Sequence, residues 1–195
     1  MPEINPSVVI IAGPNGAGKS TAAPFLLQQH IGVSEFVNAD VIASGLSFRP
    51  ESVSLAAGRI MLARLRELAD ERASFAFETT LSSLTFAPWL TKLIADGYQF
   101  HLAYLWLPNA EFAKRRVKRR VALGGHMVPE QDIERRYGRS LWNLRNLFIP
   151  LATTWFVYDS SIGPDLRLIA SGGAGTIEVI EDPSAWRAIS ETIPE

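Results

Sequence analysis

Residues 13–21 read GPNGAGKST and place two glycines, a lysine and a hydroxyl residue at the spacing of a phosphate-binding P-loop. Glycines in such a turn allow successive backbone N–H groups to point at phosphate oxygens. In this pattern the lysine reaches the β- and γ-phosphates, and the hydroxyl that follows it coordinates Mg²⁺. The sequence therefore predicts a nucleotide-binding site formed by Gly13, Pro14, Asn15, Gly16, Ala17, Gly18, Lys19, Ser20 and Thr21.

Acidic side chains follow two of the apolar runs that predict strands. Asp40 comes after residues 35–38, and Glu78 with Thr80 comes at the end of residues 74–78. Because the carboxyl ends of parallel strands lie at one edge of a sheet, both acids would reach the edge that carries the P-loop. A phosphotransferase needs a carboxylate there to accept the proton of the attacking hydroxyl and to help order Mg²⁺. The alternative for Asp40 is a cap of the helix that follows it.

Basic residues are concentrated in residues 114–145, where ten Lys and Arg residues stand against three acidic ones. Arg116 and Arg120 are four residues apart, so they share one face of a predicted helix. Gly124–Gly125 ends that helix, and Pro129 begins the next. Two basic helices around a glycine hinge are typical of a lid that closes over a triphosphate. A solvated hairpin would intersperse more acids, and an RNA-binding patch would cluster aromatic residues.

Arg59 is a single charge within the apolar helical segment LAAGRIML. Its side chain either extends to solvent or faces the substrate cleft near Asp40, and the sequence favours neither alternative. We therefore treat Arg59 as a candidate substrate-binding residue, together with Asp40, Glu78 and Thr80.

The elements that position these residues alternate along the chain. Apolar runs predict strands near residues 7–12, 35–38, 74–78, 98–107 and 154–158. Helical patterns lie near residues 18–29, 53–72, 82–95, 109–123 and 129–148. This alternation predicts an α/β fold of the P-loop NTPase type, with a parallel five-stranded sheet flanked by helices. We expect a single domain over residues 1–195, with a helical lid at about 110–148 and a C-terminal appendage, a small β-hairpin and a helix, at about 164–195.

Composition bounds the function further. The chain has 195 residues, 47% of them hydrophobic, and a net charge of −1, which suits one domain with a substantial core and argues against nucleic acid as a partner. The absence of cysteine excludes disulfides, thiolate metal sites and a cysteine nucleophile. No apolar stretch approaches transmembrane length, and the first residues do not resemble a signal peptide, so we expect a cytoplasmic protein without a membrane partner.

Several motifs occur in one order along the chain: GPNGAGKS, FVNAD, SFAFETTLS, the paired Arg-Val segment, GGHMVPE and RRY. In this the chain resembles the zeta-toxin family of P-loop kinases, in its short single-domain bacterial members, over about residues 7–160. The resemblance implies a kinase that uses ATP and Mg²⁺ to phosphorylate a sugar hydroxyl of a UDP-activated amino sugar, UDP-N-acetylglucosamine. It also implies an antitoxin protein as a partner.

Carried over by position, the resemblance places Lys19 and Ser20 at the nucleotide site and makes Asp40 the catalytic base. The resemblance also makes Glu78 and Thr80 substrate-binding residues and places Arg116 and Arg120 on the lid. In the toxins a further arginine precedes the lid proline, where this chain has His126. A nucleotide-binding module without kinase turnover is the alternative, and on that interpretation the strand-end acids and the lid have no use.

Overall fold

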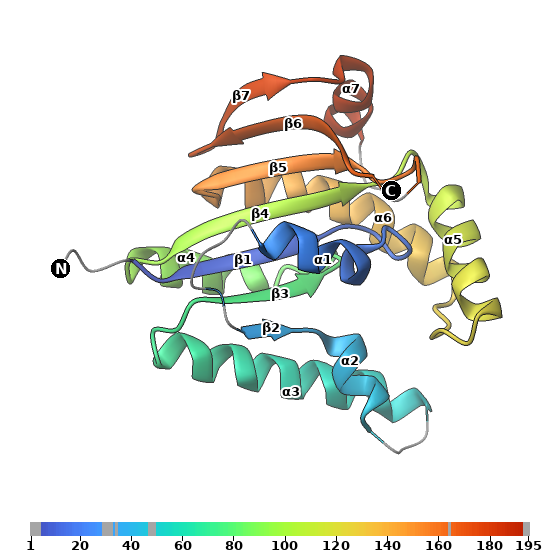
Figure 1. Cartoon of the computed structure of the whole chain (residues 1–195), viewed down its shortest axis with the longest axis horizontal. Helices are drawn as coiled ribbons and strands as arrows, with labels where there is room; N and C mark the ends of the chain where they lie inside the picture. Colours follow the sequence, from blue (N-terminus) through green and yellow to red (C-terminus); the bar gives the residue numbers. More distant parts are fainter. Residues whose placement is uncertain (1–4, 29–32, 34, 47–49, 164, 193–195) are drawn as a thin grey trace.

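The computed structural model describes residues 5–28, 33, 35–46, 50–163 and 165–192. Strands from these residues form one sheet in the order β2-β3-β1-β4-β5-β6-β7 (Figure 1). They are β1 (Ser7–Ala12), β2 (Glu35–Val37), β3 (Phe75–Thr79), β4 (Gln99–Trp106), β5 (Thr154–Asp159), β6 (Arg167–Gly173) and β7 (Thr176–Ile180). The first five pair in parallel, and β6 and β7 extend the sheet in antiparallel fashion.

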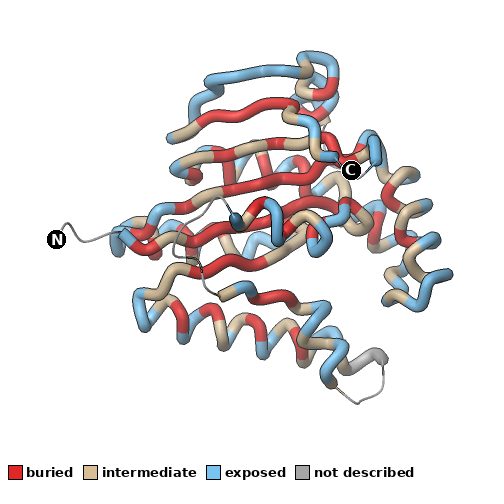
Figure 2. The backbone as a smooth tube through the Cα atoms, viewed as in Figure 1, coloured by how far each residue is buried: buried red, intermediate tan, exposed pale blue. Residues whose placement is uncertain are grey.

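Helices cover both faces of this sheet, and its central strands β1, β3 and β4 are mostly buried, whereas β7 at one edge is exposed (Figures 1 and 2). Alternate residues of β1 pack into two different hydrophobic cores, because successive side chains of a strand point to opposite faces of the sheet. Ile11 packs with α1 (Lys19–Leu27) and α5 (Ala110–Ala122). Val8 and Ile10 belong to the core that includes residues of α3 (Pro50–Asp70), α4 (Phe86–Ala95), the end of α6 (Glu130–Asn143) and α7 (Pro183–Glu191).

Asparagine caps fix where two helices begin at the carboxyl edge of the sheet. The Asn38 side chain accepts hydrogen bonds from the N–H groups of Asp40 and Val41 at the start of α2 (Ala39–Ser44). The Asn109 side chain accepts one from the N–H of Phe112 at the start of α5. Asn is among the preferred N-cap residues. The cap of α2 is therefore Asn38, and the capping alternative for Asp40 is wrong.

The predicted α/β fold with its five parallel strands is confirmed, and so are the C-terminal hairpin and helix. The hairpin is joined to the main sheet, because β6 pairs with β5, so the whole sheet is mixed. Within the described ranges, no helix combines the length and the hydrophobicity that crossing a bilayer requires.

Element boundaries differ from expectation in several places. α4 begins at Phe86 instead of near residue 82, because Leu81 has a φ of 55° and cannot belong to a right-handed helix. The helix expected to reach residue 148 is α-helical only to Asn143 and continues as a π-helix over Leu144–Phe148. α2 was not expected, and the predicted end of the first helix at residue 29 lies outside the described residues.

Gly172 in β6 permits a close approach between the strands of the hairpin. A Cβ at this position would lie 2.0 Å from the carbonyl oxygen of Thr176 and 2.8 Å from a ring carbon of the buried Trp155. Gly172→Ala is expected to lower the free energy of unfolding by roughly 1–3 kcal/mol, because neither neighbour can withdraw. Urea unfolding measures this. Gly58→Ala is the matched control: this glycine in α3 has open space around a Cβ, so alanine should stabilise by up to about 1 kcal/mol. Equal effects at both positions would contradict the close approach.

Candidate functional site

The P-loop connects the end of β1 to the start of α1. Gly13, Gly16 and Gly18 have φ angles of 142°, 80° and 83°, which side-chain-bearing residues rarely adopt. A Cβ at Gly13 would lie 2.3 Å from the carbonyl oxygen of Leu105 in the neighbouring β4, so the sheet itself demands glycine there. A Cβ at Gly18 would meet no atom within 4 Å. The N-terminus of α1 is thus open to an incoming group, and this geometry suits a phosphate.

Lys19 is buried in this loop, where its ammonium group donates a hydrogen bond to the carbonyl oxygen of Pro14 at 3.2 Å. Burial lowers the pKa of Lys19, while the charges of Glu78 and Asp40 raise it and that of Arg120 lowers it further. A buried cation is unfavourable unless an anion compensates it. The oxygens of a triphosphate would supply that compensation, so the residues present fit a bound nucleotide.

Ser20, Glu78 and Asn38 meet beside the P-loop. The Ser20 hydroxyl donates to a carboxylate oxygen of Glu78 at 2.7 Å, and the Asn38 amide donates to the Ser20 hydroxyl at 3.3 Å. The register of the sheet explains this meeting, because β3 lies directly beside β1 and pairs Glu78 with Ile11. Hydroxyl and carboxylate oxygens are ligands that Mg²⁺ prefers. In the described part of the chain, no cluster of three or more His, Cys, Asp or Glu side chains that could hold a metal ion occurs.

Among the other candidates for binding the acceptor, Asp40 and Thr80 follow β2 and β3 at the same edge of the sheet, whereas Arg59 lies within α3. Asp40 is exposed in the first turn of α2, close enough for its charge to raise the pKa of Lys19. Thr80 shares a hydrogen bond of 2.8 Å with Ser82 in the loop after β3. Arg59 is exposed on α3, and with the residues that the structure describes it forms no hydrogen bond or ion pair.

The two candidate lid arginines on α5 reach different places. Arg116 donates to the carbonyl oxygen of Ser161 at 3.2 Å, and burial lowers its pKa while the charge of Asp159 raises it. Arg120 donates to the carbonyl oxygen of His126 at 2.8 Å and lies near enough to Lys19 to lower the pKa of that lysine. Arg120 is therefore on the phosphate side of the site. His126 contributes its backbone carbonyl oxygen to this hydrogen bond, and the residue is exposed.

α5 packs directly against the P-loop. A Cβ at Gly16 would lie 3.0 Å from Cβ of Arg116 and 3.1 Å from the carbonyl oxygen of Ala113. Ala113 and Val117 are buried in the same cluster as Ala17 of the loop. The half of α5 that carries Arg116 is thus a wall of the site already in place.

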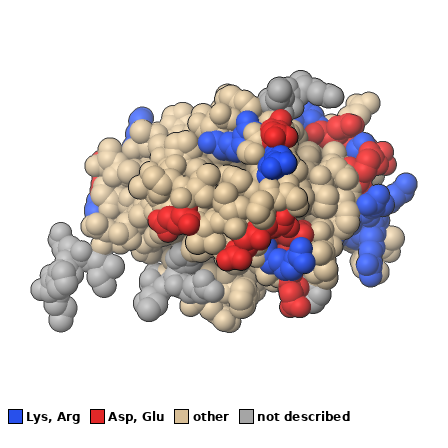
Figure 3. All heavy atoms as spheres, turned by 90° about the horizontal axis from the view of Figure 1, so that it is seen from above, with Lys and Arg blue, Asp and Glu red and all other residues tan. Residues whose placement is uncertain are grey.

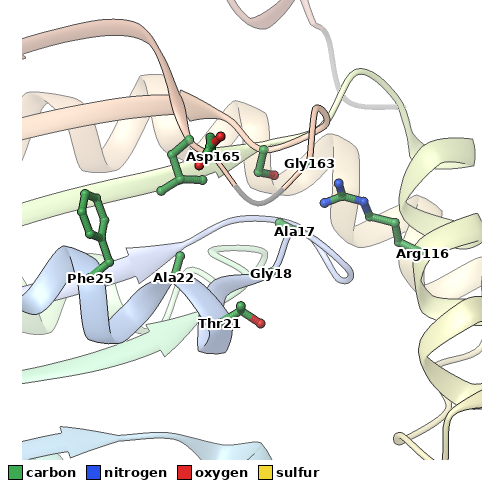
Figure 4. A pocket seen from close by; sticks show the side chains of 10 residues that line it. Ala17, Gly18, Thr21, Ala22, Phe25, Arg116, Gly163 and Asp165 are labelled. Carbon is green, nitrogen blue, oxygen red and sulfur yellow. The ribbon is translucent and has the colours of Figure 1, made fainter.

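A cavity of about 540 Å³ continues from the P-loop into the space between α1, α5 and the segment that joins β5 to β6 (Figure 4). Phe25 lines it from α1, where its side chain is 60% exposed. Arg116 lines it from α5, and Asp165 and Leu166 line it from the far side. A cavity of this size accommodates a nucleoside.

Cationic side chains gather at the end of the molecule where α5 lies, at the right of Figure 3. Lys114 is neutralised by Glu111 at 2.7 Å and Glu134 at 3.1 Å. The other five basic residues of α5 have no such ion pair among the described residues: Arg115, Arg116, Lys118, Arg119 and Arg120. Positive charge on this wall attracts an anionic ligand to the P-loop beside it.

Residues 8–137 match AAA_33, a family described as an AAA domain. The chain belongs to the AAA_33 family. An uncharacterized protein of Haemophilus influenzae is 29% identical to this AAA_33 chain over 132 residues, which cover 66% of the chain and 91% of that protein. The matched range contains the P-loop, both strand-end acids and both candidate lid arginines.

Solved structures show the same fold at low sequence identity. The crystal structure of AvrRxo1-ORF1:-ORF2 with ATP is similar with a TM-score of 0.75 and 17% identity, over 96% of this chain and 64% of that chain. The PezAT chromosomal toxin–antitoxin system of Streptococcus pneumoniae is similar with a TM-score of 0.66 and 14% identity, over 96% and 78%. The AAA_33 chain thus spans just under two thirds of the AvrRxo1 chain. These likenesses show the fold alone, and they agree with the predicted α/β fold of the P-loop type.

Sequence reasoning missed part of this AAA_33 site. Asn38 contacts Ser20 and caps α2, and its position directly after β2 was the available signal. Phe25, Asp165 and Leu166 belong to no motif, since they are brought to the cavity only by the packing of distant segments.

Lys19→Met tests the buried charge. Because burial lowers the pKa of Lys19, the charged lysine disfavours the folded state near neutral pH, and this penalty is relieved as the pH rises toward the ordinary value of 10.5. In the absence of nucleotide, Lys19→Met should therefore melt at the same temperature as the wild type at pH 7, or at a higher one. It should also lose the rise in melting temperature that Mg·ATP gives the wild type. Lys92→Met, an exposed lysine on α4, is the control and should keep that rise. Retention of the rise by Lys19→Met would remove Lys19 from the nucleotide site.

Proposed function

We propose that this protein is an ATP- and Mg²⁺-dependent kinase that transfers the γ-phosphate to a hydroxyl of a small molecule, with a UDP-activated amino sugar as the first acceptor to test. One observation carries the proposal: a buried cation, a hydroxyl–carboxylate pair and an exposed carboxylate converge at one edge of the sheet. They are Lys19, Ser20 with Glu78, and Asp40. A module that only binds nucleotide has no use for Asp40.

The nucleotide would bind with its phosphates in the P-loop and its nucleoside in the adjoining cavity. The loop amides and Lys19 hold the phosphates, and Phe25 offers an aromatic face to the base. Ser20 and Glu78 would hold Mg²⁺, which neutralises charge on the β- and γ-phosphate oxygens when it is bound. The contact with Ser20 supports a metal-side role for Glu78, in place of the substrate contact that the resemblance implied.

Transfer would then proceed with Asp40 as the base. Its carboxylate accepts the proton of the acceptor hydroxyl, and the hydroxyl oxygen forms a bond to the γ-phosphorus. The bond from that phosphorus to the β,γ-bridging oxygen breaks, and ADP leaves with the electron pair. Lys19 and Arg120 stabilise the negative charge on the transferring group.

We also propose a protein partner of the antitoxin kind. The similarity of fold to a toxin–antitoxin system supports it, and so does the resemblance of the sequence to zeta toxins. We further propose that the segment beyond α5, where Leu123 and Met127 are strongly exposed, is the part of the lid that closes over an acceptor.

The acceptor is identified by incubating the protein with Mg·ATP and a panel of hydroxyl compounds. UDP-N-acetylglucosamine, other nucleotide sugars, free sugars, nucleosides and a 5′-hydroxyl RNA oligonucleotide are analysed for the mass of an added phosphoryl group. We expect the product on the amino sugar nucleotide. Nucleotide that is bound but never consumed with any compound would favour the binding module instead.

Asp40→Asn should fold and bind Mg·ATP nearly normally, because Asn38 and not Asp40 caps α2. Transfer to the acceptor should fall by at least about 10²-fold, since an amide cannot accept the proton. Steady-state kinetics at saturating substrates measure the loss. A rate close to that of the wild type would exclude Asp40 as the base.

Arg120→Ala and Arg116→Ala should separate turnover from nucleotide affinity. Arg120 lies near Lys19, so its loss should lower kcat by about 10³-fold or more with little change in the affinity for ATP. Arg116 lines the cavity, so its loss should mainly weaken ATP binding. Isothermal titration and initial rates distinguish the two. Identical effects of both substitutions would contradict the different positions of the two side chains.

A further inference from the structure

Leu81 adopts a backbone conformation that its side chain disfavours. It lies three residues after Glu78, and its φ is 55°, in the left-handed region. Its side chain is fully buried in the same core cluster as Leu141 and Leu144. Strain of this kind persists only where surrounding contacts enforce it, and it gathers at functional sites. The contacts that hold Leu81 therefore fix the loop after β3, residues 80–85, which we name the acceptor loop.

Both peptide groups of Leu81 are tied by hydrogen bonds. The side-chain amide of Asn143 donates to the carbonyl oxygen of Leu81 at 2.6 Å, and both residues are buried. On the other side, the N–H of Leu81 donates to the hydroxyl of Thr79 at 3.2 Å. A buried carbonyl that loses its donor incurs a desolvation cost, so the amide of Asn143 favours the strained conformation over its alternatives.

Asn143 is itself held in place by contacts that do not involve the acceptor loop. The hydroxyl of Tyr137 donates to the carbonyl oxygen of Leu107 at 2.7 Å, and the hydroxyls of Ser140 and Tyr104 share a hydrogen bond of 2.7 Å. Tyr137, Ser140 and Asn143 are spaced three apart and so lie along one face of α6. The amide of Asn143 is therefore positioned by the end of β4 and not by the loop that it holds.

The helix also changes character at this point. α6 ends at Asn143, and a π-helix, Leu144–Phe148, follows immediately. Such π-helical turns are rare and are frequent at functional sites. The change of helical type directly after Asn143 is a second, independent sign that this end of α6 serves the site.

The acceptor loop presents groups that suit a ligand rich in hydroxyls. Two pairs of side-chain hydroxyls are hydrogen-bonded within it, Thr80 with Ser82 at 2.8 Å and Ser83 with Thr85 at 2.7 Å. Because Thr80 and Ser82 are the chain neighbours of Leu81, a rotation of the Leu81 peptide would displace these two hydroxyls first.

We propose that Asn143 is a positioning residue for phosphoryl transfer. Its amide clamps Leu81 in the left-handed conformation, and the clamp holds the acceptor loop, with Thr80, in the position that presents it to the substrate. The role in transfer rests on the proposed kinase function, whereas the clamp itself does not. Asn143 touches neither ATP nor acceptor and acts through the loop.

Asn143→Leu tests the clamp, because leucine has a similar size and cannot donate a hydrogen bond. Asn146→Leu is the matched control, since it makes the same substitution at an exposed asparagine whose amide donates to the carbonyl oxygen of Trp142 and not to the acceptor loop. Hydrogen–deuterium exchange of residues 79–85 in the free protein should rise by about tenfold or more in Asn143→Leu and stay unchanged in Asn146→Leu. Should Asn143→Leu fail to fold, Asn143→Ser gives the same contrast, because serine is too short to reach Leu81 and can bond within its own helix.

The kinetic arm uses Mg·ATP with UDP-N-acetylglucosamine. A loop displaced by a fraction of an ångström should lower kcat/KM for the acceptor by about 10- to 10²-fold, with the affinity for ATP unchanged. Asn146→Leu should keep the kinetic constants of the wild type. Equal exchange in both variants, or unchanged transfer despite faster exchange, would overturn the proposal. A wild type that transfers no phosphoryl group would instead count against the kinase function. The hydrogen–deuterium exchange measurement would still test whether Asn143 holds Leu81 in place.

Discussion

A buried ammonium group in the turn between β1 and α1 determines what the rest of the structure must provide. Lys19 is removed from water by the sheet and by α5, and within the chain its charge is balanced only in part by Asp40 and Glu78. The fold therefore holds a cation whose energy falls when phosphate arrives. The position of Gly13 against β4 keeps the turn in place for this, so the binding geometry is set by the sheet before any ligand is present.

The order of the strands determines which chemistry can surround that cation. β3 lies beside β1 and β2 lies beside β3, so the segments that follow both strands end next to the P-loop. This is why two acids far apart in sequence could be predicted to share one edge: the prediction needed only parallel strands and their carboxyl ends. The P-loop could be predicted for a related reason, because its chemistry is local and uses backbone groups that a short motif specifies.

The parts that could not be predicted all depend on packing between distant segments. A spacing of four placed Arg116 and Arg120 on one helix face, but their separate directions follow from what lies opposite each turn, Ser161 for one and Lys19 with His126 for the other. Phe25 and Asp165 meet at a cavity only after α1 and the β5–β6 segment are in place. In the sequence, Asn143 is indistinguishable from Asn146, although one amide is buried against Leu81 and the other bonds its own helix.

The nucleotide side of the site is enclosed by packed elements, whereas the opposite side is held by fewer contacts. On the nucleotide side, the P-loop is enclosed by β4 and by the buried half of α5, and Arg116 is already held by Ser161. On the acceptor side, Asp40 is exposed on a short helix, and the loop after β3 keeps its shape through a strained residue and one buried amide. For the proposed kinase, a donor that is the same in every turnover suits fixed walls. Its acceptor side would have to admit a substrate and then exclude water, so a conformation held by a few specific contacts suits it better than a packed core.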